Sequence, residues 1–374
     1  MKSLYIHIPF CQSRCIYCGF YSTTLLALRD DYVAAVVREM AMREPGGDIA
    51  TIYLGGGTPS QLSTEQLRTL LYNINKVYHV MPDAEITIEC NPDDIDENYA
   101  VELADMGFNR VSLGAQTFSD DRLRMIRRRH NARQVDNAVA MLRNAGINNI
   151  SIDLMFGFPD ETLSQWESDI NHAIALQPQH ISAYSLMYEE GTPLHRMLTE
   201  GKIIETDEDL SLQMFETLVS SLTAAGYEHY EISNFAKTSF RSRHNSNYWR
   251  DVPYIGLGAA AHSYDILKRS WNVADIKEYI RIANSGSRPI EDYETIDSIT
   301  HYNDIVTTAL RTREGIALEK LPPEQREYLL HAARPMAERG LLTITDTHIH
   351  LTPRGIFVSN SIMTELIRIT NYEF

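Results

Sequence analysis

The sequence has no long hydrophobic run, few cysteines and too little positive charge for a protein that binds polyanions. Its apolar stretches, such as Val33 to Val37, are far shorter than the roughly 20 residues of a membrane-spanning helix. Lys and Arg number 34 against 50 Asp and Glu, and the net charge of −16 disfavours nucleic acid and anionic lipid as partners. Residues Met1 to Phe10 lack the layout of a secretory signal. We therefore expect a globular, cytoplasmic protein with no nucleic-acid partner.

Three of the four cysteines cluster near the N-terminus, as Cys11, Cys15 and Cys18 in a C-x3-C-x2-C motif, while Cys90 stands alone. A disulfide framework would spread its cysteines through a secreted chain, so clustered thiols here indicate a metal or cluster site. Three thiolates suit three irons of a cubane cluster and leave the fourth iron open. Zinc is the main rival, although structural zinc takes four ligands and His7, the nearest fourth ligand, precedes the loop. Free thiols are the remaining alternative, and Cys90 is expected to be a buried small residue.

Short apolar segments alternate with helical patterns from Ser3 to Ser185. The expected strands are Ser3–Ile8, Thr51–Leu54, Ala84–Glu89, Arg110–Gly114, Asn149–Met155 and His180–Ser185. One segment between them, 63–78, opens with a Ser-x-x-Gln capping box. Six strand–helix repeats predict a parallel sheet covered by helices, either open and doubly wound or closed into a full or partial barrel. In both arrangements ligands bind at the carboxyl ends of the strands.

The pattern changes after about Asp207. A helix is expected over 209–225, and the chain is mostly helical from Ile296 onward. Two short runs near the end, 340–344 and 348–351, are expected to pair as strands. We therefore expect residues 1–206 to form the α/β domain and 207–290 a connecting segment. Residues 291–374 are expected to form a smaller, mainly helical, winged-helix-like domain.

The cysteine motif, embedded in Tyr5-Ile6-His7-Ile8-Pro9-Phe10-Cys11, resembles the radical S-adenosylmethionine (SAM) superfamily. Over most of its length the chain is similar to the oxygen-independent coproporphyrinogen III oxidase group. The further motifs are Gly55-Gly56-Gly57-Thr58-Pro59, Glu89-Cys90-Asn91-Pro92, Gly114-Ala115-Gln116 and Asp153-Leu154-Met155-Phe156-Gly157-Phe158-Pro159. This resemblance implies a partial (β/α)6 radical SAM barrel with a [4Fe–4S] cluster held by the three cysteines in its mouth. It also implies SAM bound to the open iron.

The resemblance further implies a set of SAM-binding residues: Tyr5, Tyr17, Gly56, Gly57, Thr58, Glu89, Gln116, Arg128 and Asp153. Plainer alternatives stand beside it. The glycines would also serve a strand-to-helix turn, Asp153 would also suit a structural salt bridge, and both tyrosines would suit a core. Arg128 lies in a basic run, 122–133, whose arginines otherwise fit a solvated helix face.

Two branches of this group differ at features visible in the sequence. The dehydrogenase branch has a further cysteine two positions after the third, where this chain has Phe20, and carries an N-terminal extension that is not seen before Tyr5. The segment His244-Asn245-Ser246-Asn247-Tyr248-Trp249 matches the HNxxYW signature of the heme chaperone branch, HemW. That resemblance makes His244 the expected heme ligand, with the two aromatic residues stacking on the porphyrin. The alternative is a hydrogen-bonded loop histidine beside core aromatics.

The expected function is therefore to bind heme, together with a [4Fe–4S] cluster and SAM, and to deliver heme to a recipient hemoprotein. A respiratory, membrane-associated hemoprotein is one such recipient, an electron donor is a further candidate partner, and both a monomer and a homodimer are compatible. Whether the protein is an enzyme stays open. The alternative is a dehydrogenase that decarboxylates coproporphyrinogen III by radical chemistry. A nucleic-acid-binding regulator is disfavoured by the charge of −16.

Overall fold

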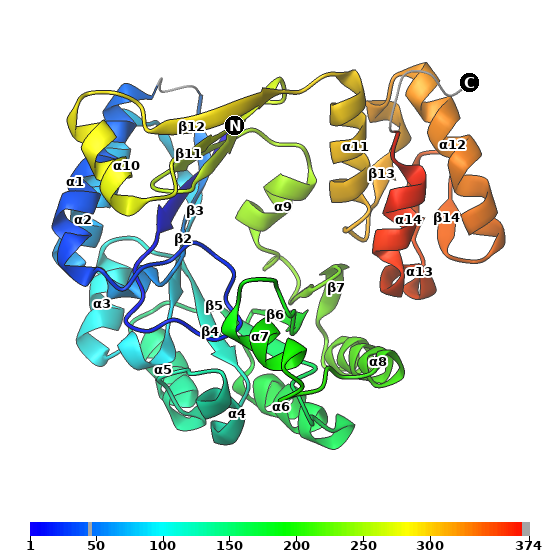
Figure 1. Cartoon of the computed structure of the whole chain (residues 1–374), viewed down its shortest axis with the longest axis horizontal. Coiled ribbons are helices and arrows are strands. Elements are labelled where there is room, and N and C mark those ends of the chain that lie inside the picture. The colour runs from blue at the N-terminus through cyan, green and yellow to red at the C-terminus, as the bar shows by residue number, and fades with distance from the viewer. Residues whose placement is uncertain (44–46, 369–374) are drawn as a thin grey trace.

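The computed structural model describes residues 1–43 and 47–368, and its main element is one curved sheet of twelve strands (Figure 1). Neighbouring strands follow the order β12-β11-β10-β9-β1-β2-β3-β4-β5-β6-β8-β7. The six central strands are parallel, with bounds β1 Lys2–Ile8, β2 Ile49–Gly56, β3 Val80–Cys90, β4 Arg110–Gln116, β5 Asn149–Phe156 and β6 His180–Ser185. A doubly wound sheet reverses its order in the middle, whereas these strands lie in chain order. The expected partial (β/α)6 barrel is thus confirmed.

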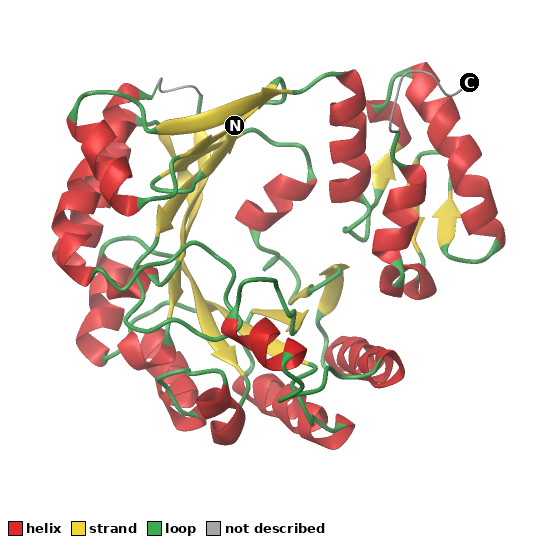
Figure 2. Ribbon diagram, in the orientation of Figure 1, coloured by secondary structure: helices red, strands yellow, loops and turns green. Residues whose placement is uncertain are grey.

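Helices cover the outer face of this sheet (Figure 2). Those between the parallel strands are α1 Arg29–Met42, α2 Thr64–Val77, α3 Glu97–Asp105, α4 Asp120–Met125, α5 Ala132–Asn144 and α6 Leu163–Leu176. The expected capping box starts α2: the Gln66 N–H donates to the Ser63 hydroxyl, and the Ser63 N–H donates to the Gln66 side chain. Short 3-10 turns lie at Leu26–Leu28, Pro59–Gln61, Pro92–Asp94 and Leu318–Lys320. The strands were recognisable because a sheet covered on both faces needs nearly continuous apolar segments.

The chain beyond β6 extends both edges of the same sheet. After α7 (Pro193–Thr199) and α8 (Glu208–Ala224), the strands β7 (Glu228–Glu231) and β8 (Asn234–Ala236) form one edge, with β8 antiparallel to β6. The other edge consists of β9 Tyr254–Leu257, which is parallel to β1, then β10 His262–Tyr264, β11 Lys268–Asn272 and β12 Ile290–Thr295, with α10 Ile276–Asn284 between the last two.

The segment that carries the HNxxYW signature is a short helix, α9 (Arg243–Trp249), on the inner side of the curved sheet (Figure 1). It contacts β2 on one side and α11 (Ser298–Ala309) on the other. The signature was expected in the connecting segment 207–290, and within that segment it lies on a helix that packs inside the barrel. This placement decides what its side chains can reach.

The C-terminal part is a separate group of helices around a small sheet (Figure 2). Its elements are α11, β13 Ile316–Ala317, α12 Pro323–Glu338, β14 Leu342–Ile344, β15 His348–Leu351, α13 Pro353–Phe357 and α14 Ser359–Leu366. The expected strand pair is present as antiparallel β14 and β15, and β13 adds a third strand. The hairpin is not terminal, because α13 and α14 follow it and close the helical core. The domain boundaries expected from the sequence, at 1–206, 207–290 and 291–374, stay a prediction.

None of the helices within 1–43 and 47–368 combines the length and the apolar composition that crossing a bilayer requires.

Candidate functional site

A cavity of about 470 Å³ lies within the barrel, at the carboxyl ends of the parallel strands. It brings together most of the expected site residues: Cys11, Cys15, Tyr17, Cys18, Gly56, Gly57, Thr58, Glu89, Gln116, Arg128 and Asp153. Tyr5 and His244 are not among its lining residues. The cysteine loop, three strand ends and an arginine from the basic run therefore meet at one place, as expected for ligands of a parallel sheet.

Backbone hydrogen bonds hold the cysteine loop over this cavity. The Cys11 N–H donates to the Thr23 carbonyl at 2.9 Å, which closes the base of the loop. At its centre, the Ile16 N–H donates to Ile126 at 3.3 Å and the Ile16 carbonyl accepts from Leu194 at 2.9 Å. The Ile16 side chain is buried in a small apolar cluster with Ile126, Met155, Phe158, Leu186 and Leu194. The loop is thus fixed to α4, β5 and α7.

The three thiols fit a cluster better than a single ion. In the part of the chain that the structure describes, no three His, Cys, Asp or Glu side chains converge as ligands of one metal ion. Structural zinc needs such convergence, whereas a cubane takes one thiolate for each of three separate irons. Burial raises the pKa of the Cys11 and Cys18 thiols, so metal binding is needed to hold them as thiolates.

The neighbouring histidine and the fourth cysteine are both committed elsewhere. His7 Nδ1 lies 3.1 Å from the Tyr5 hydroxyl, and its Nε2 lies 3.0 Å from the Tyr21 carbonyl. Burial lowers the pKa of His7 to about 4. Cys90 is buried, and burial raises the pKa of its thiol well above the usual range. His7 is therefore not presented as a fourth ligand, and Cys90 is a small core residue.

Glu89 is fixed at the inner wall of the cavity. Its carboxylate accepts from the Tyr53 hydroxyl at 2.7 Å and from the Gly56 N–H at 3.0 Å. Burial raises the pKa of this carboxyl to about 7. Gly56 has φ +110°, and a Cβ there would lie 2.4 Å from the His7 ring. The glycine is therefore required by packing against β1 as well as by its place in the cavity wall.

Asp153 accepts hydrogen bonds from hydroxyl groups, and the positive charge of Arg110 acts on it without forming an ion pair. Ser112 donates to it at 3.0–3.1 Å and Ser151 at 3.4 Å. Among the described residues no basic side chain forms an ion pair with it, so the salt-bridge alternative is not supported. Burial raises the pKa of this carboxyl. Ser112 was not recognised from the sequence, where it is one small residue in an apolar strand.

Arg110 was missed as well. It lies at the start of β4, is 1% exposed, and lines the inner end of the cavity. Its Nε and Nη1 have no hydrogen-bond partner among the described residues. A sequence alone gives no reason to place an arginine at that position inside the barrel, because charged residues are rarely fully buried.

Arg128 reaches from the end of α4 to the cysteine loop. Its Nη1 lies 3.8 Å from Cys15 Sγ, and its Nη2 donates to the Gly114 carbonyl. A Cβ at Gly114 would lie 2.7 Å from Arg128 Nη2, so the glycine leaves room for the guanidinium. The buried Arg128 Nε has no partner in the described part of the chain. A donor of this kind suits the carboxylate of a SAM molecule.

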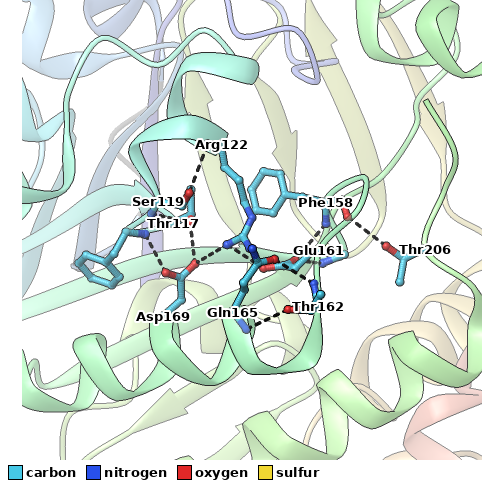
Figure 3. A network of polar contacts seen from close by, with 11 residues as sticks. Thr117, Ser119, Arg122, Phe158, Glu161, Thr162, Gln165, Asp169 and Thr206 are labelled. Atoms are coloured by element: carbon cyan, nitrogen blue, oxygen red, sulfur yellow. Dashed lines mark hydrogen bonds and ion pairs between the residues drawn. The ribbon is translucent and has the colours of Figure 1, made fainter. Parts of the chain in front are cut away.

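A buried ionic network braces this side of the site (Figure 3). Arg122 is 9% exposed, and its Nη1 lies 3.1 Å from Glu161 Oε1 and 3.5 Å from Asp169 Oδ2. Glu161 accepts the N–H of Gly157 at 2.8 Å, and Asp169 accepts the Thr117 hydroxyl at 2.6 Å. The network therefore ties together the loops that follow β4 and β5, directly behind the strand ends that carry the site.

The basic run consequently divides into two groups. Arg124, Arg127 and Arg133 are exposed, as a solvated face requires. That interpretation is wrong for the other three: Arg122 is buried, the Arg128 guanidinium contacts the cysteine loop, and Arg129 is held in ion pairs with two aspartates.

His244 lies deeper in the barrel than the cavity. It is 1% exposed, with Nδ1 2.8 Å from Thr51 Oγ1 and Nε2 2.9 Å from the Tyr248 hydroxyl. Burial lowers its pKa to about 3. The ring of Tyr5 stacks on Tyr53 at 6.2 Å and lies 6.4 Å from the His244 ring. Both imidazole nitrogens are engaged in this conformation, so heme ligation by His244 stays a prediction.

Comparison with known proteins bears on the whole chain. The Radical SAM superfamily profile matches residues 5–173, and the HemN C-terminal domain profile matches residues 296–358. A protein of Bacillus subtilis named heme chaperone HemW is 35% identical over 371 residues, covering 97% of this chain and 98% of that protein. The chain belongs to the HemW family. The Escherichia coli HemW is 37% identical over 265 residues, which are 70% of this chain and 69% of the relative.

This chain shares its architecture with a solved enzyme structure. The Escherichia coli coproporphyrinogen III oxidase HemN matches with a TM-score of 0.85 at 22% identity, covering 98% of this chain and 89% of the enzyme. At that identity the match shows the fold alone. Membership of the radical SAM superfamily implies a [4Fe–4S] cluster and SAM, and the cysteine loop and Arg128 are suited to both. The assignment of individual SAM-binding residues stays a prediction.

Proposed function

We propose that this protein is a heme chaperone, which binds heme and a [4Fe–4S] cluster with SAM and delivers the heme to a recipient hemoprotein. The observation that carries the proposal is the family: relatives named heme chaperone HemW align over nearly the whole chain at 30–35% identity. The match is not confined to the barrel, so it includes the elements that a radical SAM fold alone does not require. Candidate recipients are respiratory hemoproteins, including membrane-associated ones, and a cytoplasmic location fits delivery to them.

Within this proposal the cavity holds the cofactors. Cys11, Cys15 and Cys18 would each bind one iron of the cluster. Arg128 would pair with the SAM carboxylate through the donor that has no protein partner, and Glu89 would accept from a ligand ammonium or hydroxyl. When bound, the cluster can supply an electron to SAM, as in radical SAM enzymes. In a chaperone the cluster and SAM serve a structural or gating role. An electron donor is a partner only where that role requires the cluster to be reduced.

His244 can ligate heme only after a local rearrangement. An iron at Nε2 would replace the Tyr248 hydroxyl, and an iron at Nδ1 would replace Thr51. One neutral hydrogen bond contributes about 1 kcal/mol, so an iron–imidazole bond would more than offset the loss of that hydrogen bond. Access to the ring requires α9 to shift, since the ring is buried and the Glu85 carboxylate accepts the N–H groups of Arg243 and His244.

The second candidate function is oxidative decarboxylation of coproporphyrinogen III. The shared fold favours it. Phe20 disfavours the decarboxylation function, because this exposed phenylalanine lines the cavity at the position where the dehydrogenase branch has its additional cysteine. The two functions differ in what happens to the tetrapyrrole: a chaperone releases it unchanged, whereas the enzyme converts two propionates to vinyl groups.

The test is anaerobic incubation of cluster-loaded protein with coproporphyrinogen III, SAM and a reductant, with the tetrapyrroles separated by chromatography. The substrate should be recovered unchanged, although the same preparation binds added heme with a Soret band. Formation of protoporphyrinogen IX would overturn the chaperone proposal and establish the second candidate.

A further inference from the structure

The outer rim of the cavity carries large apolar side chains that face solvent. Phe20 is 72% exposed, Met187 64% and Tyr184 43%, and all three line the cavity. Phe20 follows the last cysteine of the loop, while the other two come from the end of β6 and the segment after it. These segments touch, because a Cβ at Gly19 would overlap the Glu189 carboxylate. Exposed apolar side chains gathered at a cavity mark a binding surface.

Two uncommitted arginines lie on the same rim. Arg14 and Arg127 are exposed and line the cavity, and neither side chain forms a hydrogen bond or ion pair with any described residue. By contrast, Arg129 pairs with two aspartates. The rim therefore offers two guanidinium groups that have no partner among the described residues, and Glu189 also lines the cavity.

The backbone of Arg127 has a conformation that arginine rarely adopts. Its φ is +61°, in the left-handed region, and it ends α4 in a Schellman motif. The Arg127 N–H donates to Arg124 at 3.1 Å and the Arg128 N–H donates to Leu123 at 2.8 Å. Glycine is the favoured residue at this position, because it alone adopts the conformation without strain. An arginine there carries backbone strain that glycine would relieve, so Arg127→Gly removes the guanidinium without a cost in backbone conformation.

We propose that this rim, formed by Arg14, Phe20, Arg127, Tyr184 and Met187, is the docking site for heme on this protein. The inference rests on the proposed function and deepens it. Heme combines a flat apolar macrocycle with two propionates, which matches apolar side chains beside two unpaired guanidinium groups. Phe20 thereby gains a role in place of the missing cysteine: it covers the porphyrin face. Heme then meets the protein at the cavity mouth, and His244, buried in the barrel, is not the first contact.

The test is a heme titration of the full-length, cluster-loaded protein, followed at the Soret band. Three variants are compared with the wild type: Arg127→Gly, Arg14→Gln combined with Arg127→Gly, and Phe20→Ser combined with Met187→Ser. Leu267→Ser and Arg133→Gln are matched controls, since Leu267 is 71% exposed and both residues lie outside the cavity lining. Iron content, SAM affinity and thermal midpoint are measured for every variant.

Each double variant should raise the heme Kd at least tenfold, with iron content and SAM affinity unchanged. Arg127→Gly alone should weaken heme binding while its thermal midpoint stays equal to that of the wild type or rises, because glycine relieves the left-handed strain. Misfolding cannot produce that combination. The controls should bind heme as the wild type does.

Three results would overturn the docking site. Unchanged heme affinity in the rim variants, together with its loss in His244→Ala, would place heme at α9 and leave the proposed function intact. Loss of SAM or iron with unchanged heme affinity would assign the rim to the cofactor site. Absence of heme binding by the wild type itself would overturn both the docking site and the chaperone function. Failure of the docking site alone is thus distinguishable from failure of the proposed function.

Discussion

Replacing Arg122 with methionine removes the guanidinium that lies between the buried carboxylates of Glu161 and Asp169 (Figure 3). Breaking a buried ion pair by removing one partner costs about 3–5 kcal/mol, because the remaining charge stays desolvated. Here backbone N–H groups of Gly157 and Phe158 still donate to Glu161. We therefore expect the lower end of this range, about 3 kcal/mol of unfolding free energy at pH 8.

The loss should depend on pH in a defined direction. Burial raises the pKa of Glu161 from its usual 4.5 to about 7, and burial also raises that of Asp169. A carboxyl whose folded pKa is raised binds its proton more tightly in the folded state, so stability falls as the pH rises through this interval. Without Arg122 the folded pKa rises further. The variant should accordingly lose most stability above pH 7 and less than half as much near pH 5, where the carboxyls are protonated.

Urea unfolding at pH 5 and pH 8, followed by circular dichroism, measures both effects. Arg124→Met is the control: Arg124 is exposed and pairs with the exposed Asp121, so it should change stability by less than about 0.5 kcal/mol. Adding Glu161→Gln to Arg122→Met should recover part of the loss at pH 8. Equal stability of Arg122→Met and the wild type at pH 8, or a loss that is the same at both pH values, would refute the reasoning.

Three further predictions concern the cofactors and α9. Replacing the three loop cysteines with alanine should abolish iron binding and the visible absorbance of anaerobically reconstituted protein, whereas Cys90→Ala should retain both; the triple variant is Cys11→Ala, Cys15→Ala and Cys18→Ala. Glu89→Gln should weaken SAM binding about tenfold at pH 8 in calorimetry, and wild-type affinity should fall below pH 7 as the Glu89 carboxyl, with its pKa raised by burial to about 7, takes up a proton. Because burial lowers the pKa of His244 to about 3, wild-type stability should decline as the pH falls from 6.5 toward 3, and His244→Gln should flatten that part of an acid-unfolding curve while reducing heme occupancy. SAM affinity that is independent of pH would contradict the Glu89 prediction. An acid-unfolding curve of His244→Gln that equals the wild-type curve between pH 6.5 and 3 would contradict the His244 prediction.

The parallel barrel was predictable because its strands carry their signal locally. Strands buried on both faces require continuous apolar segments, and Ser63 with Gln66 fixes the start of α2 through neighbours three residues apart. The extra strands β7 to β12 were not recognisable in the same way. They are short, and β9 pairs with β1, which lies about 250 positions earlier in the chain, so their partners are set by tertiary contacts.

The candidate site was predictable in its residues and only partly in its contacts. The cysteine loop was identified from the number and spacing of its thiols and Arg128 through a resemblance, and both line the cavity. Ser112 contacts Asp153 from the neighbouring strand β4. The carboxylate partners of Arg122 lie about 40 positions further along the chain, in the loop before α6 and in α6 itself, so no local pattern reveals either contact. From the sequence alone a run of arginines indicates a solvated helix face, and only the fold shows which of these side chains point inward. The same holds for His244, whose burial depends on α9 folding into the barrel.

The most direct test of the central claim is an anaerobic heme titration of the cluster-loaded protein, recorded at the Soret band. A heme chaperone must hold its cargo at a defined site, so the account predicts saturable binding of a single heme with a Kd near or below ~1 µM. A signal that rises with heme concentration without saturating, equal to that of a protein with no heme site, would contradict the account.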